Sequence, residues 1–239
     1  MQTMHEELNY FSDNPSLNLS QTNQYDKVNA FMYYMNSYSA LNFSIISNLF
    51  YGTYEIAVLC HKCNILLYNY QKFEFISFEI FDYEFKKFDI YNGFEDNSKP
   101  QQLRGENQFY CNIWKNWEDA EITSKIIQPP NKLLIYIDYG KNNEFKPYKV
   151  KFDETIDITK FVCFDFDVPI KYKIMGVCTH LHSSESYDHY VAFCKHRETG
   201  EWYNFNDSSC KKCTNQNEIY EGSPYLLLYE KIENEIQEN

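Results

Sequence analysis

The sequence predicts an α+β fold in which a short helical segment leads into an antiparallel β-sheet. Apolar residues recur at spacings of three and four between about residues 26 and 50, which favours amphipathic helices. After residue 51 they come in short runs separated by turn-forming residues, a pattern typical of antiparallel strands. The chain contains 22 Tyr and 19 Phe, which favour strands. Its 239 residues can form one large domain or two small ones.

The composition argues against several kinds of partner. With 34 acidic and 22 basic residues, the net charge is −12, which argues against a nucleic-acid-binding surface. The longest apolar runs, such as 133–137 and 225–229, fall far short of the roughly 20 residues that span a bilayer, so no membrane span is predicted. Because the first residues lack the pattern of a signal peptide, we expect a reducing compartment, the cytoplasm and/or the nucleus.

The elements can be predicted in order along the chain. Residues 1–25 are polar and rich in Asn, Ser and Gln, so we expect a poorly ordered lead-in. Residues 26–50 are predicted to form one or two helices. Residues 51–90 are predicted to form strands joined by tight turns, and 92–108 a surface loop. Residues 232–239 are expected to be a solvated acidic tail.

Two β-hairpins are predicted in the second half of the chain. The first spans residues 133–152 with its turn at Gly140-Lys-Asn-Asn. The second spans residues 190–205 with its turn at Glu198-Thr-Gly200. The apolar segment Tyr225–Tyr229 is expected to close the same sheet.

A possible zinc site begins at the C-x2-C motif Cys60-His-Lys-Cys63, which can direct two thiolates toward one tetrahedral ion. Cys111 is the next cysteine, and Trp114 stands three residues later, where a second such motif would place its partner. His61 is a conceivable fourth ligand, although adjacent residues rarely bind one ion without strain. Two interpretations stay open: a filled zinc site, or a collapsed former site packed with Trp114.

A candidate catalytic pair consists of His189 and Asn206. His189 begins the predicted strand of the second hairpin, and Asn206-Asp207 follows the end of its second arm. Because the start of one arm lies beside the end of the other, the imidazole and the amide or carboxylate come within hydrogen-bond reach. Such a pair is the base and orienting group of a nucleophilic site. On spacing alone, a histidine capping a strand beside an Asx turn remains an alternative.

The sequence around these residues resembles that of one protein family. The stretches His189–Ser209 and Glu221–Glu230 resemble the His box and closing strands of the ubiquitin-specific proteases (USPs), papain-like cysteine peptidases that release ubiquitin from conjugates. In that family the patterns G-H-Y-x-A, W-Y-x-F-(D/N)-D-S and A-Y-x-L-x-Y occur in this order and at this spacing. Segments 130–137 and 149–158 resemble the family's preceding strands, and the resemblance covers roughly residues 26–231.

The resemblance implies a specific architecture. It is the papain-like cysteine peptidase fold, with an antiparallel palm sheet and a β-finger subdomain. Residues 26–50 would be helical, 51–128 would form the fingers, and 129–231 would form the palm with the His box. The thumb lobe, which carries the nucleophilic cysteine in the family, would be largely missing.

The resemblance also implies site residues and a partner. His189 would be the general base, Asn206 would orient it, and Asp207 would support the oxyanion. Three finger ligands of zinc would be Cys60, Cys63 and Cys111, with Trp114 replacing the fourth. The family's partners are ubiquitin and ubiquitinated proteins, and its chemistry requires no cofactor; zinc remains possible at an incomplete site.

Two departures from the family pattern limit the expected activity. Asp188 replaces the glycine that precedes the family histidine, and no cysteine precedes Cys60, so the family's G-N-T-C-Y-M-N-S box is absent. The fragment Tyr33–Ser37 copies part of that box with Tyr at the nucleophile position, and we interpret it as coincidence. We therefore expect an inactive chain with ubiquitin binding left open. The alternatives are a piece of a longer active deubiquitinase, or a scaffold that kept the fold without binding ubiquitin.

Overall fold

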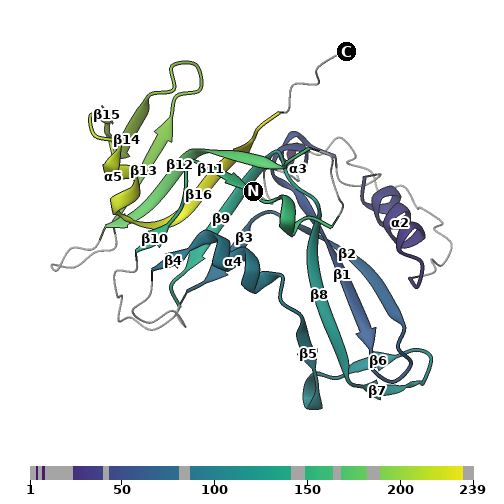
Figure 1. The fold of residues 1–239 in the computed structure, drawn as a ribbon. Helices are drawn as coiled ribbons and strands as arrows, with labels where there is room; N and C mark the ends of the chain where they lie inside the picture. Colours follow the sequence, from purple (N-terminus) through teal and green to yellow (C-terminus); the bar gives the residue numbers. More distant parts are fainter. Residues whose placement is uncertain are drawn as a thin grey trace. The chain divides into compact units, whose positions relative to one another are not determined.

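The computed structural model (Figure 1) describes residues 24–39, 43–80, 87–140, 149–163, 168–181 and 189–233, together with Met4, Glu7 and Leu8. Most of the predicted lead-in and tail lies outside these residues. The chain folds into two compact units. The first comprises Met1–Glu74, Ser98–Pro130 and Phe161–Phe164, and the second Phe75–Asn97, Asn131–Lys160 and Asp165–Asn239.

The first unit is built on an antiparallel four-stranded sheet in the order β2-β1-β8-β5. Its strands are β1 (Gly52–Cys60), β2 (Leu66–Phe73), β5 (Gln101–Leu103) and β8 (Ala120–Gln128). A short antiparallel pair, β6 (Phe109–Cys111) and β7 (Asn116–Glu118), follows the 3-10 helix η1 (Gly105–Asn107). This pair carries one cysteine of the motif predicted to bind zinc.

Two helices fall within the segment predicted to be helical, α2 (Lys27–Ser39) and α3 (Ile45–Phe50). A capping box starts α3: the Ser44 hydroxyl accepts the Ser47 N–H at 3.1 Å, and the Ser47 hydroxyl accepts the Ser44 N–H at 2.9 Å. A small core joins α2 to the sheet through Ala30, Tyr70 and Ile127. None of the described helices is long and apolar enough to cross a membrane.

The second unit is built on a larger sheet in the order β15-β14-β13-β12-β16-β9-β3, with β11 also pairing with β12. All of these pairings are antiparallel except that of β3 with β9. The strands are β3 (Ile76–Glu79), β9 (Lys132–Asp138), β11 (Thr155–Asp157), β12 (Lys171–Leu181), β13 (His189–Lys195), β14 (Trp202–Asn206), β15 (Ser209–Lys212) and β16 (Ser223–Lys231). The smaller elements are α4 (Ile90–Asn97), α5 (Asn217–Glu221), η2 (Thr159–Phe161) and the parallel pair β4 (Phe88–Asp89) and β10 (Val150–Lys151).

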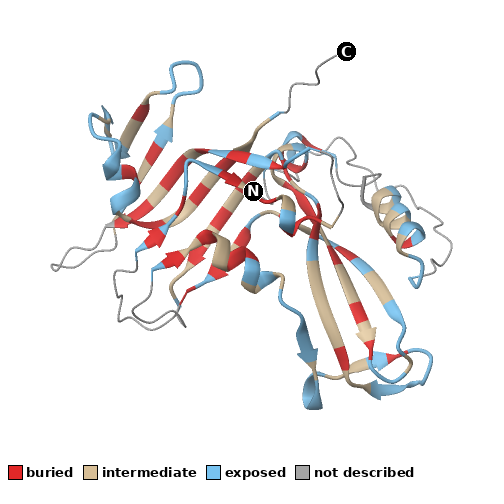
Figure 2. Ribbon diagram, viewed as in Figure 1, coloured by how far each residue is buried: buried red, intermediate tan, exposed pale blue. Residues whose placement is uncertain are grey.

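One face of the large sheet forms the core of the second unit, visible as buried bands across its strands in Figure 2. Along β9, Leu133, Ile135 and Ile137 are fully buried, whereas the residues between them are half-buried. Phe78 on β3 lies against Phe94, with ring centroids 4.9 Å apart. A Cβ on Gly93 would stand 2.3 Å from the Phe78 ring, so glycine lets α4 approach the sheet closely. The sheet therefore packs the core against one face, and the β9 side chains on its other face are half-buried.

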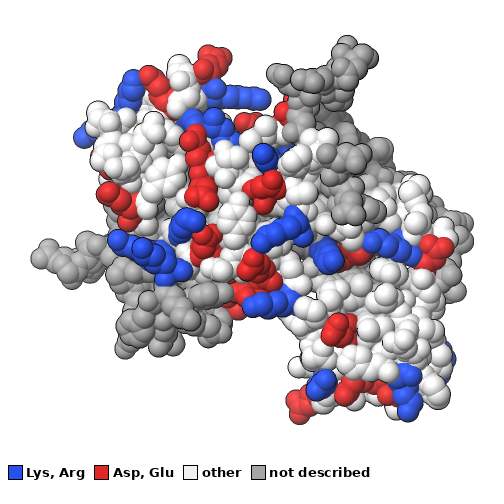
Figure 3. Space-filling view, in the orientation of Figure 1, with Lys and Arg blue, Asp and Glu red and all other residues white. Residues whose placement is uncertain are grey.

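Charged side chains do not gather into a basic patch on the face shown in Figure 3, where both signs are interspersed. In the second unit, several basic side chains form ion pairs with acidic ones. Lys151 Nζ lies 2.8 Å from Asp89 Oδ2, and Lys160 Nζ lies 2.8 Å from Glu95 Oε1. The exposed pairs contribute little stability individually.

The prediction of a hairpin over residues 133–152 is wrong. Strand β9 pairs with β16 and with β3, whereas β10 pairs in parallel with β4. The turn signal at Gly140 is local, and it contains no information about a closing strand some ninety residues later that competes for β9. The second predicted hairpin is confirmed as β13 and β14, with Ala192 opposite Phe205.

The segment before residue 108 also differs from the sequence prediction. The loop predicted over 92–108 contains most of α4 and all of β5. Asn, Gly and Asp indicated a loop there, but Ile90 and Phe94 fix the helix by burying one of its faces. Residues 75–97, part of the segment predicted to form the fingers, belong to the second unit because β3 pairs with β9.

Asp157 at the end of β11 should make the protein more stable at neutral than at acid pH. Burial acts to raise its pKa, but the hydroxyl and backbone N–H of Thr159, at 2.5 and 3.0 Å from Oδ1, more than offset burial and lower it. A lowered pKa stabilises the fold above the unfolded value of about 4, and this contribution is lost as pH falls through the folded value.

We therefore expect Asp157→Asn to flatten the dependence of unfolding free energy on pH below about pH 5. Urea unfolding at pH 7 and at acid pH measures this. A variant with the same acid sensitivity as the wild type would show that Asp157 does not contribute to it.

Candidate functional site

His189 and Asn206 lie together at one end of the β13–β14 hairpin. Because Ala192 pairs with Phe205, the next pair in register is Val191 with Asn206, and partners point to the same face. His189 is two residues from Val191, so its ring also points to that face. Its Nε2 atom lies 2.8 Å from Asn206 Oδ1. The structure thus brings the two predicted residues into direct contact.

The direction of this hydrogen bond determines which ring nitrogen can act as a base. The Asn206 carbonyl oxygen can only accept, so the Nε2 atom of His189 donates its N–H. In a neutral ring the lone pair is then on Nδ1, which can accept a proton from a substrate or a thiol. The arrangement is a base held by an orienting group, as a nucleophilic site requires.

Asp207 occupies the turn that joins β14 to β15. Its φ of 48° is in the left-handed region, which Asp tolerates better than most residues, and the flanking residues Asn206 and Ser209 pair across the turn. Within the described residues, its carboxylate makes no hydrogen bond to His189. The role of Asp207 in oxyanion support stays a prediction. Asp188, which precedes His189 in the sequence, lies outside the described residues.

The thiols nearest to His189 in sequence point away from it. Cys178 pairs with Ala192, and Cys194 is two residues from Ala192 on the same strand, so both lie on the face opposite to His189. Cys210 pairs with Phe205, the partner of Ala192, and so shares their face. Burial raises the pKa of the Cys178 and Cys194 thiols. These three thiols are therefore poor candidates for the nucleophile.

A row of aromatic rings, which we call the aromatic row, crosses this sheet on the face opposite to the His189 ring, because Tyr190 follows His189 directly on β13. Its members are His180, Tyr190, Tyr225, Tyr136 and Phe75, with successive ring centroids 4.5, 5.1, 5.0 and 6.3 Å apart. Burial and hydrogen bonding to the Tyr225 hydroxyl raise the pKa of Tyr136 to about 12. Tyr190 is 43% exposed, so the row offers an apolar surface on the face away from the core.

Sequence analysis did not identify the aromatic row. Tyr190 and Tyr225 stand in the sequence only as parts of motifs, and no pattern predicts the pairing of β9 with β16 that brings Tyr136 near Tyr225. Alternation along β9 was the available signal, since Tyr136 lies between the apolar residues Ile135 and Ile137 and so must face the other way.

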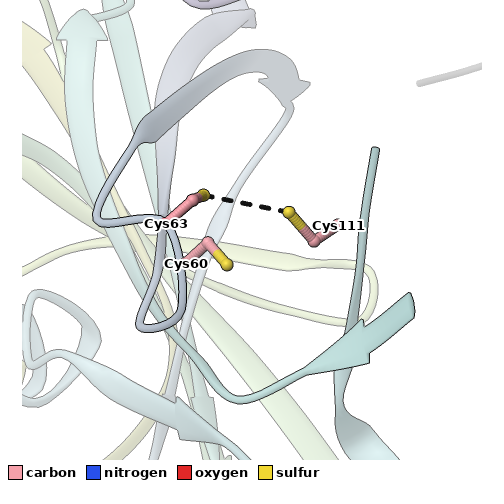
Figure 4. Close-up of side chains that lie close together, drawn as sticks. All are labelled: Cys60, Cys63 and Cys111. Carbon is pink, nitrogen blue, oxygen red and sulfur yellow. Dashed lines mark hydrogen bonds between the residues drawn. The ribbon is translucent and has the colours of Figure 1, made fainter. Parts of the chain in front are cut away.

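The first unit contains a cluster of three cysteines, shown in Figure 4. The Sγ atoms of Cys60, Cys63 and Cys111 lie within 4.8 Å of one another, and the Cys63 and Cys111 sulfurs are 3.8 Å apart. Zinc–sulfur bonds of about 2.3 Å in a tetrahedron place two sulfurs about 3.8 Å apart. The three thiols therefore fit three corners of a zinc site.

The chemistry of the cluster also suits a metal. Backbone N–H groups of Trp114 and Ile113 point at the Cys111 sulfur and lower the pKa of its thiol, the form of support that a ligating thiolate needs. Burial, together with the nearby thiols of Cys60 and Cys111, raises the pKa of Cys63. A bound cation would favour the thiolate form of all three.

Comparison with known proteins gives consistent results along almost the whole chain. A family model described as "Ubiquitin carboxyl-terminal hydrolase" matches residues 1–229. Ubiquitin carboxyl-terminal hydrolase 17-like protein B of Mus musculus is 25% identical over 188 residues, covering 78% of this chain and 39% of the relative. Ubiquitin carboxyl-terminal hydrolase 5 of Saccharomyces cerevisiae is 27% identical over 212 residues, covering 80% of this chain and 25% of the relative. The chain thus spans well under half the length of these relatives.

Solved structures share the fold. A chain in the yeast SAGA DUB module superposes with a TM-score of 0.66 and 23% identity, covering 84% of this chain and 44% of that one. A chain in the SAGA DUB module bound to ubiquitin aldehyde gives a TM-score of 0.65 and 21% identity, covering 85% of this chain and 47% of that one. The predicted α+β, papain-like fold class is confirmed.

Proposed function

This chain belongs to the ubiquitin carboxyl-terminal hydrolase family, and we propose that it is a ubiquitin-binding domain of the USP type that supplies the base of a deubiquitinating site without its nucleophile. The observation that carries the proposal is the hydrogen bond between His189 Nε2 and Asn206 Oδ1, at 2.8 Å. It orients the imidazole and leaves the lone pair of a neutral ring on Nδ1, the atom that would take a thiol proton. Asp207 is proposed to support the developing oxyanion from the adjoining turn.

The proposed inactivity of the chain alone rests on its thiols. No cysteine precedes Cys60 in the sequence. Three of the eight cysteines form the cluster in the first unit, where Cys163 also lies, bonded to Glu55. Cys178, Cys194 and Cys210 lie on the sheet face opposite to His189, and Cys213 lies opposite Trp202, four residues along β14 from Asn206. A histidine base without an adjacent thiol cannot generate the thiolate that attacks a ubiquitin carbonyl.

Ubiquitin binding is proposed to use the aromatic row. Two solved relatives are SAGA DUB modules bound to ubiquitin aldehyde and to monoubiquitin. In this chain, Tyr190 follows His189 on β13 with its ring on the opposite face of the strand, and it begins a row of rings that spans several strands. Half-exposed tyrosines are effective anchors at protein interfaces. The net charge of −12 complements the basic C-terminal tail of ubiquitin.

Two measurements on the purified chain test the proposal. A fluorogenic amide at the ubiquitin C-terminus should show no turnover above buffer. Labelled ubiquitin should bind, and Tyr190→Ala should weaken binding about tenfold, the loss of a typical aromatic anchor. The matched control is Tyr220→Ala, because Tyr220 is 37% exposed on α5 but lies outside the aromatic row.

Two results would overturn parts of the proposal. Turnover that His189→Ala abolishes would show that the chain is active by itself. An absence of binding at high micromolar ubiquitin would favour the second candidate, a scaffold that kept the fold and lost ubiquitin recognition.

A third candidate is that this chain is a piece of a longer active deubiquitinase. The observation that favours it is the coverage of the relatives, of which the chain spans 39% or less in the two cited cases. Sequencing the transcript upstream of Met1 tests it. An in-frame G-N-T-C-Y-M-N-S box would supply the missing nucleophile and would replace the proposal of an inactive domain.

A further inference from the structure

The cysteine cluster is built from two turns of the same backbone design. The first turn runs from Cys60 to Asn64 and the second from Cys111 to Lys115. In each, the fifth residue has a left-handed φ, 56° at Asn64 and 53° at Lys115. In each, the N–H of that fifth residue donates to the carbonyl of the first at 2.8 Å. Because positive φ is uncommon for residues other than glycine, this repeated geometry marks two equivalent knuckles.

The equivalence assigns one knuckle position to each potential ligand. Cys60 corresponds to Cys111, and Cys63 corresponds to Trp114, since each pair occupies the first and fourth positions of its knuckle. The Sγ atoms of the three cysteines already lie within 4.8 Å of one another. The fourth corner of a tetrahedron is therefore the corner that the Trp114 position would serve.

Trp114 does not fill that corner. Its side chain is 53% exposed, and the Lys62 ammonium lies 5.5 Å from the ring centroid, so the indole is held at the surface by a cation–π contact. The alternative of a collapsed site packed with Trp114 therefore does not match this geometry. Among the described residues, no His, Asp, Glu or further Cys joins the three thiols, and all eight cysteines are described.

We propose that the cluster is a three-thiolate zinc site with an open fourth position that takes an exchangeable ligand from outside the chain. Three protein ligands plus one exchangeable ligand complete the tetrahedron that zinc prefers. Water would occupy the position in the isolated protein, and a monothiol would displace it, because thiolates are better ligands for zinc than water is. A four-cysteine site, by contrast, has no position to exchange.

Cobalt substitution distinguishes the two kinds of site in the full chain. The protein is reduced with a phosphine, loaded with Co²⁺, and titrated with 2-mercaptoethanol. The intensity of the thiolate-to-cobalt charge-transfer band should rise by about one third, because 2-mercaptoethanol adds a fourth thiolate to the three cysteines. In Trp114→Cys, the four-thiolate intensity should be present from the start and should not respond to the monothiol.

The control is Trp117→Cys, which adds a thiol on β7 at a position that is 59% exposed and outside the knuckle. It should behave as the wild type does, with the same response to 2-mercaptoethanol. Competition with a chelator provides a second readout, in which Trp114→Cys should hold zinc at least tenfold more tightly than the wild type.

Three results would overturn the proposal. The first is wild-type absorption that already has four-thiolate intensity, which would show that another residue closes the site. The second is a failure of the wild type to bind Co²⁺ or Zn²⁺, which would show a metal-free cluster. The third is a folded Trp114→Cys variant whose spectrum matches that of the wild type. If this variant does not fold, the response of the wild type to the monothiol still decides.

Discussion

Replacing Trp202 with alanine is expected to lower the free energy of unfolding by about 3–5 kcal/mol, the range for truncating a buried tryptophan. Trp202 is 4% exposed at the start of β14, opposite Lys195 on β13. Its indole lies on the same face of β14 as Asn206, which comes four residues later on the strand. Alanine would leave a cavity beneath the hairpin that carries both members of the candidate catalytic pair.

Urea unfolding followed by circular dichroism measures the loss, and the chain provides its own matched control. Trp117 is 59% exposed on β7, so Trp117→Ala removes the same side chain from a site that is already hydrated. We expect a change below about 1 kcal/mol there. Equal losses from the two substitutions would mean that Trp202 does not pack as described.

The Trp202 substitution also has a consequence at the site. His189 and Asn206 are held at 2.8 Å by the register of β13 and β14 rather than by contacts of their own with the core. A loosened hairpin should weaken the proposed binding of ubiquitin in proportion to its local unfolding, because the aromatic row includes Tyr190 on the same strand. Hydrogen exchange of the β13 amides would show this loosening directly.

The candidate pair could be predicted from sequence because its geometry is local. A hairpin brings the start of one strand next to the end of the other whatever the rest of the chain does, so the spacing from His189 to Asn206 predicts that the two side chains meet. Their catalytic role was implied by the resemblance to a family and not by the spacing. The tyrosines of the aromatic row could not be placed in the same way. Their row depends on β16 pairing with both β9 and β12, contacts between segments about 50 to 90 residues apart.

The cysteines show the same distinction. The spacing of Cys60 and Cys63 predicts one knuckle, and Trp114 stands in the sequence at the missing fourth position. That Cys111 comes within a few ångströms of them depends on β6 and β7, a hairpin that the sequence analysis did not predict. The direction of the Trp114 indole depends in turn on Lys62 across the turn, which no pattern within either motif indicated.

Replacing Lys27 with methionine is expected to cost about 2–3 kcal/mol of unfolding free energy. Lys27 on α2 places its ammonium 3.0 Å from Glu55 Oε1, and the Glu55 side chain on β1 is almost fully buried. The Cys163 thiol donates to the same carboxylate oxygen at 3.0 Å, and the Tyr70 hydroxyl donates to the other oxygen at 3.2 Å. Without Lys27, a buried carboxylate would retain hydrogen bonds but no counter-charge.

The matched control is Lys160→Met, because Lys160 pairs with Glu95 at a similar distance of 2.8 Å while both side chains are more than half exposed. Its cost should stay below about 1 kcal/mol, as is usual for surface ion pairs. The double variant with Met at both 27 and 55 should be more stable than Lys27→Met alone, since the uncompensated charge is then gone. If Lys27→Met and Lys160→Met lower the free energy of unfolding equally, Glu55 is hydrated in solution. The ion pair of Lys27 with Glu55 then does not anchor α2. A double variant less stable than Lys27→Met would instead show that the Glu55 hydrogen bonds to Tyr70 and Cys163 outweigh its lost ion pair.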